Sequence, residues 1–463
     1  MSLSKQEDEK LLSKIIKSID NGENVILHGP GGTGKTYILR TISTEVCKNK
    51  VIFCTATTGI AAMNLSIPEC NISATTLHSW AGVGLAQETE EKLLEKVRKG
   101  IARKRWEKVD LLIIDEIGML GSVFIDKLDY IGREIRGINK PFGGIQLLLS
   151  GDFLQLPPVK DGWLFDSEVW SQLDIHPFIF DVPKRYDDVQ YFELLLRMRQ
   201  GTPSEGDIKK MRARVRSYKK LIKILEEKKD NVNIIKPTIL SSKKIDVEYE
   251  NEKELALLKG EEVCYIAIDT FKPYKSSARS DYYMRSLEDT IPKTITLKVG
   301  AQVMLKKNIS VKDGLVNGSR GVVLEINSTS TKVRFINGMK IDIPVDVWEL
   351  KDKDGKATRT QIPLILAWSL TIHKVQGCTL DYAICNLGGS IFSPGQAYVA
   401  LSRVRNIKGL FLSCFLESSI IVSKKALKFS KSLELLSKEL ENKTIENEDS
   451  DDSEDFSAML GDL

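Results

Sequence analysis

The chain has 463 residues, of which 42% are hydrophobic and 28% are charged, and its formal net charge is +4. This length predicts roughly two to four domains with real hydrophobic cores. No stretch approaches about 18 consecutive apolar residues, so no membrane span is predicted. The polar, partly acidic N-terminus predicts neither a secretory signal nor a mitochondrial presequence. The seven cysteines form no Cys-x-x-Cys pair, which favours a reduced compartment without a zinc site. We therefore expect a soluble intracellular protein of the nucleus or cytoplasm.

Charge is unevenly distributed along the chain. The segment from Glu441 to Leu463 carries nine acidic residues and one lysine, a net charge of −8, so the rest of the chain carries about +12. A positive body suits a polyanionic partner such as nucleic acid. The acidic end, residues 436–463, predicts a disordered tail that docks a protein partner, only improves solubility, or competes with the polyanionic partner for the positive body.

The first strong signal in chain order is a phosphate-binding loop. An apolar run at 24–28 predicts a strand, and a run at 37–42 predicts the start of a helix. Between them, Gly-Pro-Gly-Gly-Thr-Gly-Lys-Thr fits the P-loop pattern, whose backbone N–H groups bind phosphates at a helix N-terminus. Lys35 would reach the β- and γ-phosphates, and the Thr36 hydroxyl would hold Mg²⁺. The candidate nucleotide-binding residues of this loop are Gly29, Gly31, Gly32, Thr33, Gly34, Lys35 and Thr36.

Two further predicted strands end in polar residues that complete a nucleotide site. The apolar run at 109–114 leads into Asp115 and Glu116, the Walker B pattern. Asp115 would hold Mg²⁺ through water, and Glu116 would orient and deprotonate the attacking water. The strand predicted at 145–150 is followed by Gln155, which is well placed at the sheet edge to sense a γ-phosphate. These residues predict Mg²⁺-dependent hydrolysis of a nucleoside triphosphate.

The first part of the chain predicts one α/β domain. Residues 1–185 alternate apolar strand runs with helical segments, as a doubly wound parallel sheet requires. A charged helical stretch at 85–108 interrupts this alternation. It predicts either a small functional excursion or a solvated helix face.

The second part predicts another α/β region that is split by a β-rich insert. A basic helical segment at 207–229 precedes a core strand at 238–240. Short β-type runs at 291–362 predict a small barrel, in which Asn-Gly at 337–338 marks a hairpin turn. The apolar runs at 364–368 and 382–385 resume the α/β pattern.

These blocks together resemble the Pif1-type DNA helicases of superfamily 1B, from about residue 3 to about residue 430. The most discriminating block runs from Asp126 to Gln146 and is similar to the signature that separates Pif1 proteins from RecD-like relatives. The other blocks that resemble family motifs are TATTGIAA at 55–62, TTLHSWAG at 75–82, LVNGSRG at 315–321, TIHKVQG at 371–377 and GQAYVALSR at 395–403.

The resemblance implies two tandem RecA-like P-loop NTPase domains with ATP bound between them. Domain 1A is expected at 1–185, with a 1B wedge excursion at about 76–108. Domain 2A is expected at 186–245 and 360–435. An SH3-like 2B insert is expected at 246–359.

The resemblance also implies roles for single residues. Arg403 and Arg185 would be the two arginines that stabilise the transition state at the site opposite the P-loop. Pro-Lys-Arg-Tyr around Arg185 departs from the family's usual Phe-Arg-Gln. Gln6 resembles the adenine-reading glutamine of the Q motif. The residues expected to contact single-stranded DNA are Thr57, Thr58, Thr76, His78 and His373.

The resulting functional expectation is an ATP-driven monomeric motor that moves 5′ to 3′ on single-stranded DNA. It would open junctions of single strand and duplex in DNA replication, repair, recombination or telomere maintenance. Three alternatives stay open. A RecD- or Tra-like helicase would lack the block at 140–146, and an RNA helicase would share the same engine. A non-catalytic nucleic-acid clamp would need a broken ATP site, whereas the catalytic residues are all present.

Overall fold

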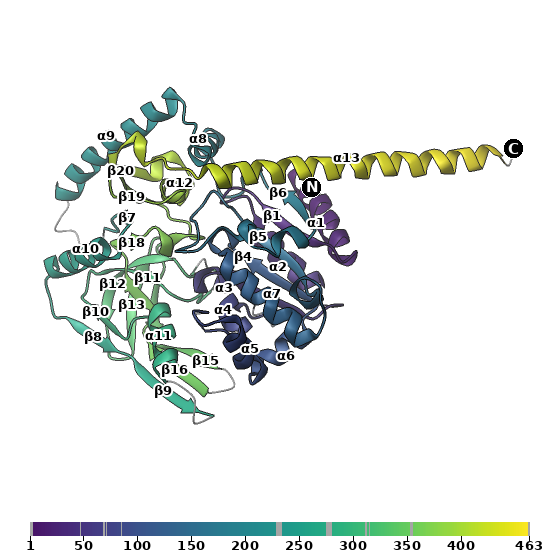
Figure 1. The fold of residues 1–463 in the computed structure, drawn as a ribbon. Coiled ribbons are helices and arrows are strands. Elements are labelled where there is room, and N and C mark those ends of the chain that lie inside the picture. The colour runs from purple at the N-terminus through teal and green to yellow at the C-terminus, as the bar shows by residue number, and fades with distance from the viewer. Residues whose placement is uncertain are drawn as a thin grey trace.

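The computed structural model describes residues 3–46, 48–67, 70, 72–84, 86–227, 234–274, 280–310, 313, 315–351 and 355–461, without the side chains of 3–5, 282, 286, 289 and 444–461. Within these residues two α/β domains and a β-rich insert lie side by side (Figure 1). None of the helices in the described ranges is both long and apolar enough to cross a membrane.

The first domain contains a parallel sheet of six strands in the order β3-β2-β4-β5-β1-β6. The strands are β1 (Asn24–His28), β2 (Ile52–Ala56), β3 (Thr75–Thr76), β4 (Leu111–Asp115), β5 (Gln146–Gly151) and β6 (Ile175–Ile179). The surrounding helices are α1 (Leu3–Asp20), α2 (Lys35–Val46), α3 (Gly59–Leu65) and α7 (Ser122–Arg136). Because all six strands are parallel, the loops after β1, β4 and β5 emerge at one edge. The strands predicted for the P-loop and Walker B motifs are confirmed.

The charged stretch that was predicted as an excursion or a solvated helix face packs on α7 of the first domain. It forms α5 (Glu90–Arg98) and α6 (Ile101–Lys108), and α4 (Leu77–Ala81) precedes it. The apolar sides of these helices belong to the core of the first domain, where Trp106 is fully buried. On the charged side, Arg98 pairs with Glu134 at 2.8 Å and Arg103 pairs with Glu107 at 2.6 Å. Because nearby carboxylates balance these cations, the solvated-face interpretation fits this surface.

Backbone-to-backbone packing characterises the block at 126–146. Gly132 of α7 lies so close to the following turn that a β-carbon there would stand 2.7 Å from the Phe142 carbonyl oxygen. Asp129 accepts a hydrogen bond from the Phe142 N–H at 2.6 Å and another from Arg133 at 2.8 Å. Phe142 itself is fully buried. The block therefore fixes the approach of α7 to β5, next to the Walker B strand.

The second domain contains a four-stranded parallel sheet in the order β18-β7-β19-β20. The strands are β7 (Thr238–Ser241), β18 (Ser369–Thr371), β19 (Ala383–Leu387) and β20 (Leu410–Phe415). The helices are α8 (Val189–Gln200), α9 (Glu205–Glu227), α10 (Lys244–Leu257) and α12 (Gln396–Leu401). Helix α9 packs along β20 at one edge of the sheet, and α10 packs on β18 at the other. The predicted basic helix is confirmed up to Glu227, whereas 228–229 lie outside the described residues.

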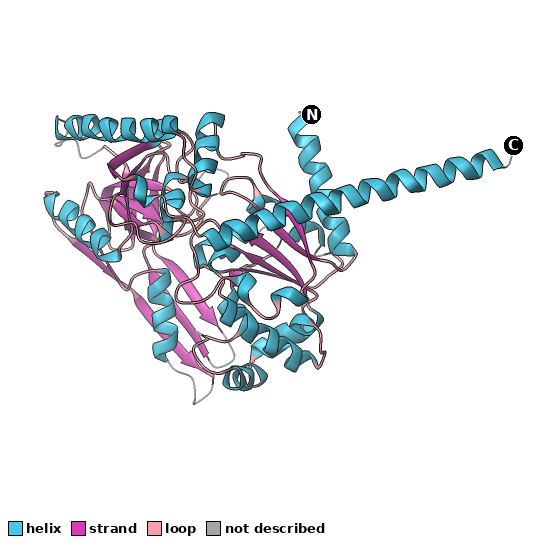
Figure 2. Cartoon of the chain, turned by 45° about the horizontal axis from the view of Figure 1, so that its top comes forward, coloured by secondary structure: helices cyan, strands magenta, loops and turns pink. Residues whose placement is uncertain are grey.

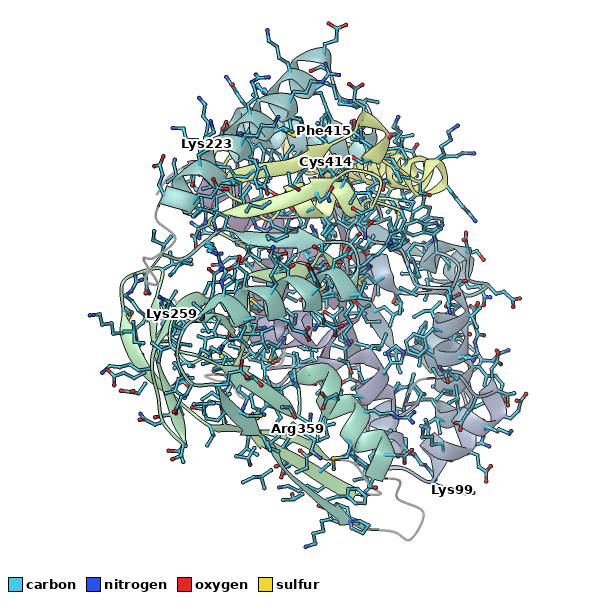
Figure 3. The ribbon with its side chains drawn as sticks, turned by 90° about the vertical axis from the view of Figure 1, so that its left-hand side faces the viewer. Lys99, Lys223, Lys259, Arg359, Cys414 and Phe415 are labelled. Atoms are coloured by element: carbon cyan, nitrogen blue, oxygen red, sulfur yellow. The ribbon has the colours of Figure 1, made fainter. Side chains whose placement is uncertain are left out.

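The insert is built from antiparallel β structure. Its sheets have the orders β14-β13-β12-β11-β17, β15-β16-β9 and β10-β8. Its elements are β8 (Val263–Ile266), β9 (Ile268–Pro273), α11 (Ser280–Thr290), β10 (Thr294–Leu297), β11 (Gln302–Leu305), β12 (Arg320–Ile326), β13 (Ser330–Phe335), β14 (Lys340–Pro344), β15 (Asp346–Lys351), β16 (Gly355–Gln361) and β17 (Leu364–Leu366). The predicted hairpin is confirmed, since β13 pairs with β14 across Asn337-Gly338. Buried Arg359 joins β16 to Asp269 of β9 and to Glu288 of α11 (Figure 3).

Two predicted boundaries of the insert differ from the structure. The run at 364–368 was expected to resume the α/β pattern, but β17 pairs antiparallel with β11 inside the insert. Residues 246–257 were assigned to the insert, but they belong to α10, where Asn251 exchanges two hydrogen bonds with the backbone of Ser369. A short apolar run cannot distinguish the two sheets because both bury its side chains.

The predicted disordered tail continues a helix instead. Helix α13 runs from Lys424 to Gly461 and projects from the body (Figures 1 and 2). Its first turns return to the first domain, where Phe429 stacks on Phe165 with ring centroids 4.0 Å apart and Ser430 Oγ lies 3.1 Å from His28 Nε2. The stretch 424–460 has no Pro or Gly and is rich in Lys, Glu and Leu. These residues favour a helix, whereas acidity alone predicted disorder.

Replacing Gly132 with alanine should destabilise the first domain. The added methyl group would stand 2.7 Å from the Phe142 backbone, which only a backbone shift can relieve. We expect the free energy of unfolding to fall by roughly 1–3 kcal/mol in a denaturant titration. Gly59→Ala is the matched control because nothing lies within 4 Å of its β position. Equal stability of the two variants would contradict this account of the block.

Candidate nucleotide site and nucleic-acid interface

The P-loop connects β1 to α2 and is shaped by its glycines. Gly32 and Gly34 have φ values of +87° and +95°, a backbone conformation that other residues rarely adopt. The Lys35 ammonium is buried under the loop and donates hydrogen bonds to the carbonyls of Gly29 and Pro30, both at 2.7 Å. Burial lowers the pKa of Lys35, and neighbouring carboxylates oppose this shift. The loop therefore holds a positive charge at the position expected for phosphate.

Thr36, Asp115 and Glu116 lie together as predicted. The Thr36 hydroxyl donates to Asp115 Oδ2 at 2.9 Å, and the Ser150 hydroxyl donates to Oδ1 at 2.8 Å. Burial raises the pKa of both Asp115 and Glu116, and the charge of Asp115 raises that of Glu116 further. A hydroxyl and a carboxylate this close form the oxygen donor set that Mg²⁺ prefers, beside phosphate. These residues therefore fit a Mg²⁺–nucleotide complex.

Arg403 brings charge from the second domain to the P-loop. A β-carbon built on Gly31 would lie 3.5 Å from Arg403 Nη2 and 3.4 Å from Gln155 Nε2. The guanidinium is fully buried and is oriented by hydrogen bonds to the Val399 carbonyl and the Ser402 hydroxyl. Burial lowers the pKa of Arg403, but an arginine stays protonated in proteins. The structure thus brings the predicted arginine and the predicted γ-phosphate sensor together.

Arg185 also lies at the P-loop, even though its flanking residues depart from the family pattern. The backbone N–H groups of Lys184 and Arg185 donate to the Gly32 carbonyl at 2.8 and 3.0 Å. The Arg185 guanidinium donates to the Ser402 carbonyl at 3.1 Å. Arg185 therefore bridges the two domains next to Arg403.

Three residues that contact this site were not predicted from the sequence. The Gly31 N–H donates to the Tyr398 hydroxyl at 3.0 Å, and the Tyr186 hydroxyl donates to the Gly31 carbonyl at 3.1 Å. Gln376 Nε2 donates to Glu116 Oε2 at 3.0 Å. Tyr398 and Gln376 lie inside motifs that the sequence did reveal, so motif membership was the available signal. Tyr186 could have been found only as the neighbour of Arg185.

A buried ion pair joins the two domains beside the site. Arg199 of α8 donates three hydrogen bonds of 2.8–3.2 Å to the carboxylate of Asp152. The side chains are 4% and 0% exposed. Burial alone would raise the pKa of Asp152, but the charge and hydrogen bonds of Arg199 outweigh it and lower the pKa. Since Asp152 starts the turn that carries Gln155, the pair fixes the sensor relative to the second domain.

Gln6 lies at the exposed start of α1, and the described contacts do not join it to the P-loop. The helix itself is held near the loop, because Asp8 pairs with Lys184 at 2.7 Å and Lys184 contacts the Gly32 carbonyl. This position is compatible with reading a base next to bound phosphates. The adenine-reading role of Gln6 stays a prediction.

The three predicted DNA-contacting threonines brace local structure. Thr58 caps α3 and Thr76 caps α4, each by accepting a backbone hydrogen bond. The Thr57 hydroxyl donates to the Glu116 carbonyl at 3.0 Å. Thr57 therefore ties this segment to the catalytic strand, and DNA contact by the three residues stays a prediction.

His78 and His373 are half-buried on different domains. Burial lowers the pKa of each ring, so both are neutral near pH 7. His78 stacks on Phe124 with ring centroids 4.0 Å apart and an interplanar angle of 9°. Neutral rings suit base stacking or hydrogen bonding better than ion pairing with phosphate.

Comparison with known proteins agrees with this geometry. A model described as "PIF1-like helicase" matches residues 3–232, and one described as "DNA helicase Pif1, 2B domain" matches residues 287–326. The crystal structure of Pif1 helicase from Candida albicans is similar with a TM-score of 0.73 and 30% identity, covering 91% of this chain and 98% of that one. The chain belongs to the Pif1-like helicase family.

Relatives of known sequence extend the comparison. The ATP-dependent DNA helicase PIF1 of Xenopus laevis is 37% identical over 409 residues, covering 86% of this chain and 60% of the relative. The human relative of the same description is 35% identical over 407 residues, covering 86% and 59%. The chain thus spans about 60% of the length of these curated relatives.

A second solved structure is also similar. Bacteroides Pif1 in complex with ADP-AlF4 has a TM-score of 0.70 at 27% identity, covering 92% of this chain and 96% of that one. The expected class of two RecA-like domains with a 2B insert is confirmed, and Pif1 membership answers the RecD- or Tra-like alternative.

Replacing Arg199 with methionine should strongly destabilise the protein. The change leaves the Asp152 carboxylate buried without its partner, which costs roughly 3–5 kcal/mol in comparable sites. Chemical denaturation measures the loss. The double variant Asp152→Asn/Arg199→Met should recover part of it, because no buried charge is left unpaired. Purely additive losses would contradict direct coupling of the two residues.

Proposed function

We propose that the chain is an ATP-dependent DNA helicase that moves 5′ to 3′ on single-stranded DNA and unwinds duplexes. The observation that supports this best is a nucleotide site divided between two domains. The first domain supplies Lys35 and Glu116, and the second supplies Arg403 and Gln376. In such a site, binding and hydrolysis of ATP couple to relative domain motion. The relatives are named ATP-dependent DNA helicases, and solved relatives include a Bacteroides Pif1 bound to single-stranded DNA.

The chemistry follows from the positions of the side chains. Lys35 would bind the β- and γ-phosphates, while Thr36 and Asp115 would hold Mg²⁺, which supplies positive charge to the phosphates. Glu116 would take the proton of the attacking water, and its raised pKa makes it a stronger base than an exposed carboxylate. The hydrogen bond from Gln376 orients that carboxylate from the second domain.

The transition state would be stabilised by Arg403 and Arg185. Both lie at the P-loop, so their interaction with the γ-phosphate would close the cleft, and hydrolysis would release it. The predicted DNA contacts are distributed in the same way, with His78 in the first domain and His373 in the second. Alternating closure and opening would then move the chain along a strand. We place this activity in replication, repair or recombination. Unwinding assays on duplexes with 5′ or 3′ single-stranded tails test the direction of movement. The same assays with RNA tracks test whether the substrate is DNA or RNA.

Replacing Glu116 with glutamine should abolish turnover and preserve nucleotide binding. Asp115 and Thr36 are unchanged in this variant, but no base accepts the proton, so kcat should fall by roughly 10²-fold or more. The measurements are DNA-stimulated ATP hydrolysis and binding of a fluorescent nucleotide. Lys35→Ala is the companion variant, because it should lose both. Loss of binding in a folded Glu116→Gln protein would point to a different base.

Replacing Arg403 with alanine should lower kcat by roughly 10³-fold or more, with a much smaller effect on ATP affinity. The guanidinium acts on charge that develops only in the transition state. Steady-state ATPase kinetics separate kcat from KM. Arg405→Ala is the control, since Arg405 is exposed and outside the site. A change of only a few-fold in Arg403→Ala would assign the role to Arg185 alone.

We also propose that the acidic end of α13 weakens DNA binding by competing for the positive body. Truncation after Leu440 should leave ATP hydrolysis intact and tighten single-stranded DNA binding a few-fold at low salt. The difference should shrink as salt screens the charges. The measurement is a salt series for both proteins. Superimposed curves would leave docking of a protein partner, or solubility, as the role of the tail.

A further inference from the structure

Helix α9 carries an uninterrupted run of positive charge. Between Asp207 and Glu226 it has eight Lys or Arg residues and no Asp or Glu. Five exposed cations recur every three or four residues and therefore share one face of the helix. This α9 stripe consists of Lys209, Arg212, Arg216, Lys220 and Lys223. At 1.5 Å per residue it is about 21 Å long.

The stripe is not neutralised by the described part of the protein. Arg212 pairs with Glu417 at 2.7 Å, and both side chains are more than half exposed. Among the described residues, the other four members have no carboxylate within ion-pair distance. Arg212, Arg216 and Lys220 are spaced four residues apart, and like charges at this spacing destabilise a helix. Around α5 and α6, by contrast, Lys99 pairs with Glu95 and Arg103 pairs with Glu107.

The stripe lies away from the predicted path of the translocated strand. Helix α9 packs along β20, and Arg214 turns inward to donate to the Ile407 carbonyl at 3.0 Å. His373 follows β18, at the opposite edge of the same sheet. Figure 1 shows α9 along the outer border of the second domain, far from α4, α5 and α6. In Figure 3, Lys223 stands near the top of the molecule, close to the strand that carries Cys414 and Phe415.

We infer that the α9 stripe is a second DNA-binding surface, which holds the phosphate backbone of DNA outside the motor cleft. The inference rests on the proposed helicase function. A duplex carries one negative charge per about 1.7 Å of its axis, so DNA lying along the stripe offers more phosphates than the stripe has cations. The stripe contains only Lys and Arg side chains and no aromatic platform, which suits backbone contact without sequence preference. We therefore assign the stripe to the parental duplex, and the displaced single strand is the alternative that the experiment separates.

The acidic end of α13 is the other negatively charged candidate for contact with the stripe. In Figures 1 and 2, α13 leaves the body on the side opposite α9, so the tail of the same chain points away from the stripe. A tail of another copy is an outcome that the experiment separates.

The test replaces four stripe residues in Lys209→Gln/Arg216→Gln/Lys220→Gln/Lys223→Gln, because glutamine keeps helix propensity. The control removes the same charge from exposed lysines of α13, in Lys424→Gln/Lys428→Gln/Lys431→Gln/Lys438→Gln. Affinity is measured over a salt series for a forked duplex, a blunt duplex, a long single strand and a short oligothymidine that fills only the cleft. We expect the stripe variant to bind forked DNA roughly tenfold or more weakly at low salt. The magnitude of the slope of log affinity against log salt concentration should fall by about 0.9 for each duplex phosphate that the variant no longer neutralises.

Binding of the short strand, and the ATPase activity it stimulates, should not change in the stripe variant. Loss on the blunt duplex would support the parental duplex as the ligand, whereas loss on the long single strand alone would overturn that assignment in favour of the displaced strand. Unchanged affinity for all long DNAs, or an equal loss in the α13 control, would overturn the inference. The inference would also be overturned if the affinity difference between the wild type and the stripe variant disappeared when both were truncated after Leu440. The acidic tail, and not DNA, would then be the ligand of the stripe. Lys209→Arg/Lys220→Arg/Lys223→Arg should bind like the wild type, which separates loss of charge from misfolding. If the short strand stimulates no ATPase in the wild type, the helicase proposal fails independently of the stripe.

Discussion

The backbone N–H and the backbone carbonyl of Gly31 are both bound by tyrosines from outside the first domain, Tyr398 and Tyr186. Its N–H donates to Tyr398, and its carbonyl accepts from Tyr186. This approach depends on the neighbouring Gly32, where a β-carbon would stand only 2.9 Å from Arg185 Cβ and 2.9 Å from Tyr186 Cε2. The same absence of side chains that lets a P-loop wrap phosphate also lets a second domain reach it. In the proposed motor, this close approach would be one of the contacts that couple nucleotide chemistry to domain motion.

The charged residues of the nucleotide site lie largely away from solvent, so each depends on its neighbours to remain charged. Lys35, Asp115 and Arg403 are buried and Glu116 is partly buried, and burial acts against the charged form of each. They stay compatible only because opposite charges and hydrogen-bond donors surround them, as Ser150 does for Asp115. Removing one partner from such a cluster leaves an uncompensated charge, so the cluster is sensitive to single substitutions. The low dielectric that makes it sensitive also strengthens its interaction with developing charge on a phosphate.

The sequence predicted the parts of this site that are local in the chain. β1 begins and ends where the apolar run at 24–28 does, and the P-loop follows because strand, glycines and helix start are contiguous. Contacts between distant segments carry no such signal. Glu116 and Gln376 are 260 residues apart, and Asp152 and Arg199 are 47 apart, so only the fold brings them together. Insert strand β17 was misassigned because a short apolar strand of three residues has the same sequence pattern in either sheet. The tail was misassigned because charge and helix propensity gave opposite predictions.

The contacts between the two domains differ in how easily they break, and this difference suggests where the proposed motor would bend. The Asp152–Arg199 pair is buried, and breaking it costs several kcal/mol, so α8 and the first domain should stay joined there. Helix α13 adds to this side, because Phe429 and Ser430 hold it to the first domain. The hydrogen bonds at Gly31 are neutral, contribute only about 1 kcal/mol each, and involve donors that phosphate can engage instead. The cleft should therefore open at Gly31 and rotate about the region of α8 and α13. Opening at the P-loop in this way would move Arg403 and Gln376 away from the first domain together. The positive charge that stabilises the transition state and the hydrogen bond that orients Glu116 would then be lost in one movement.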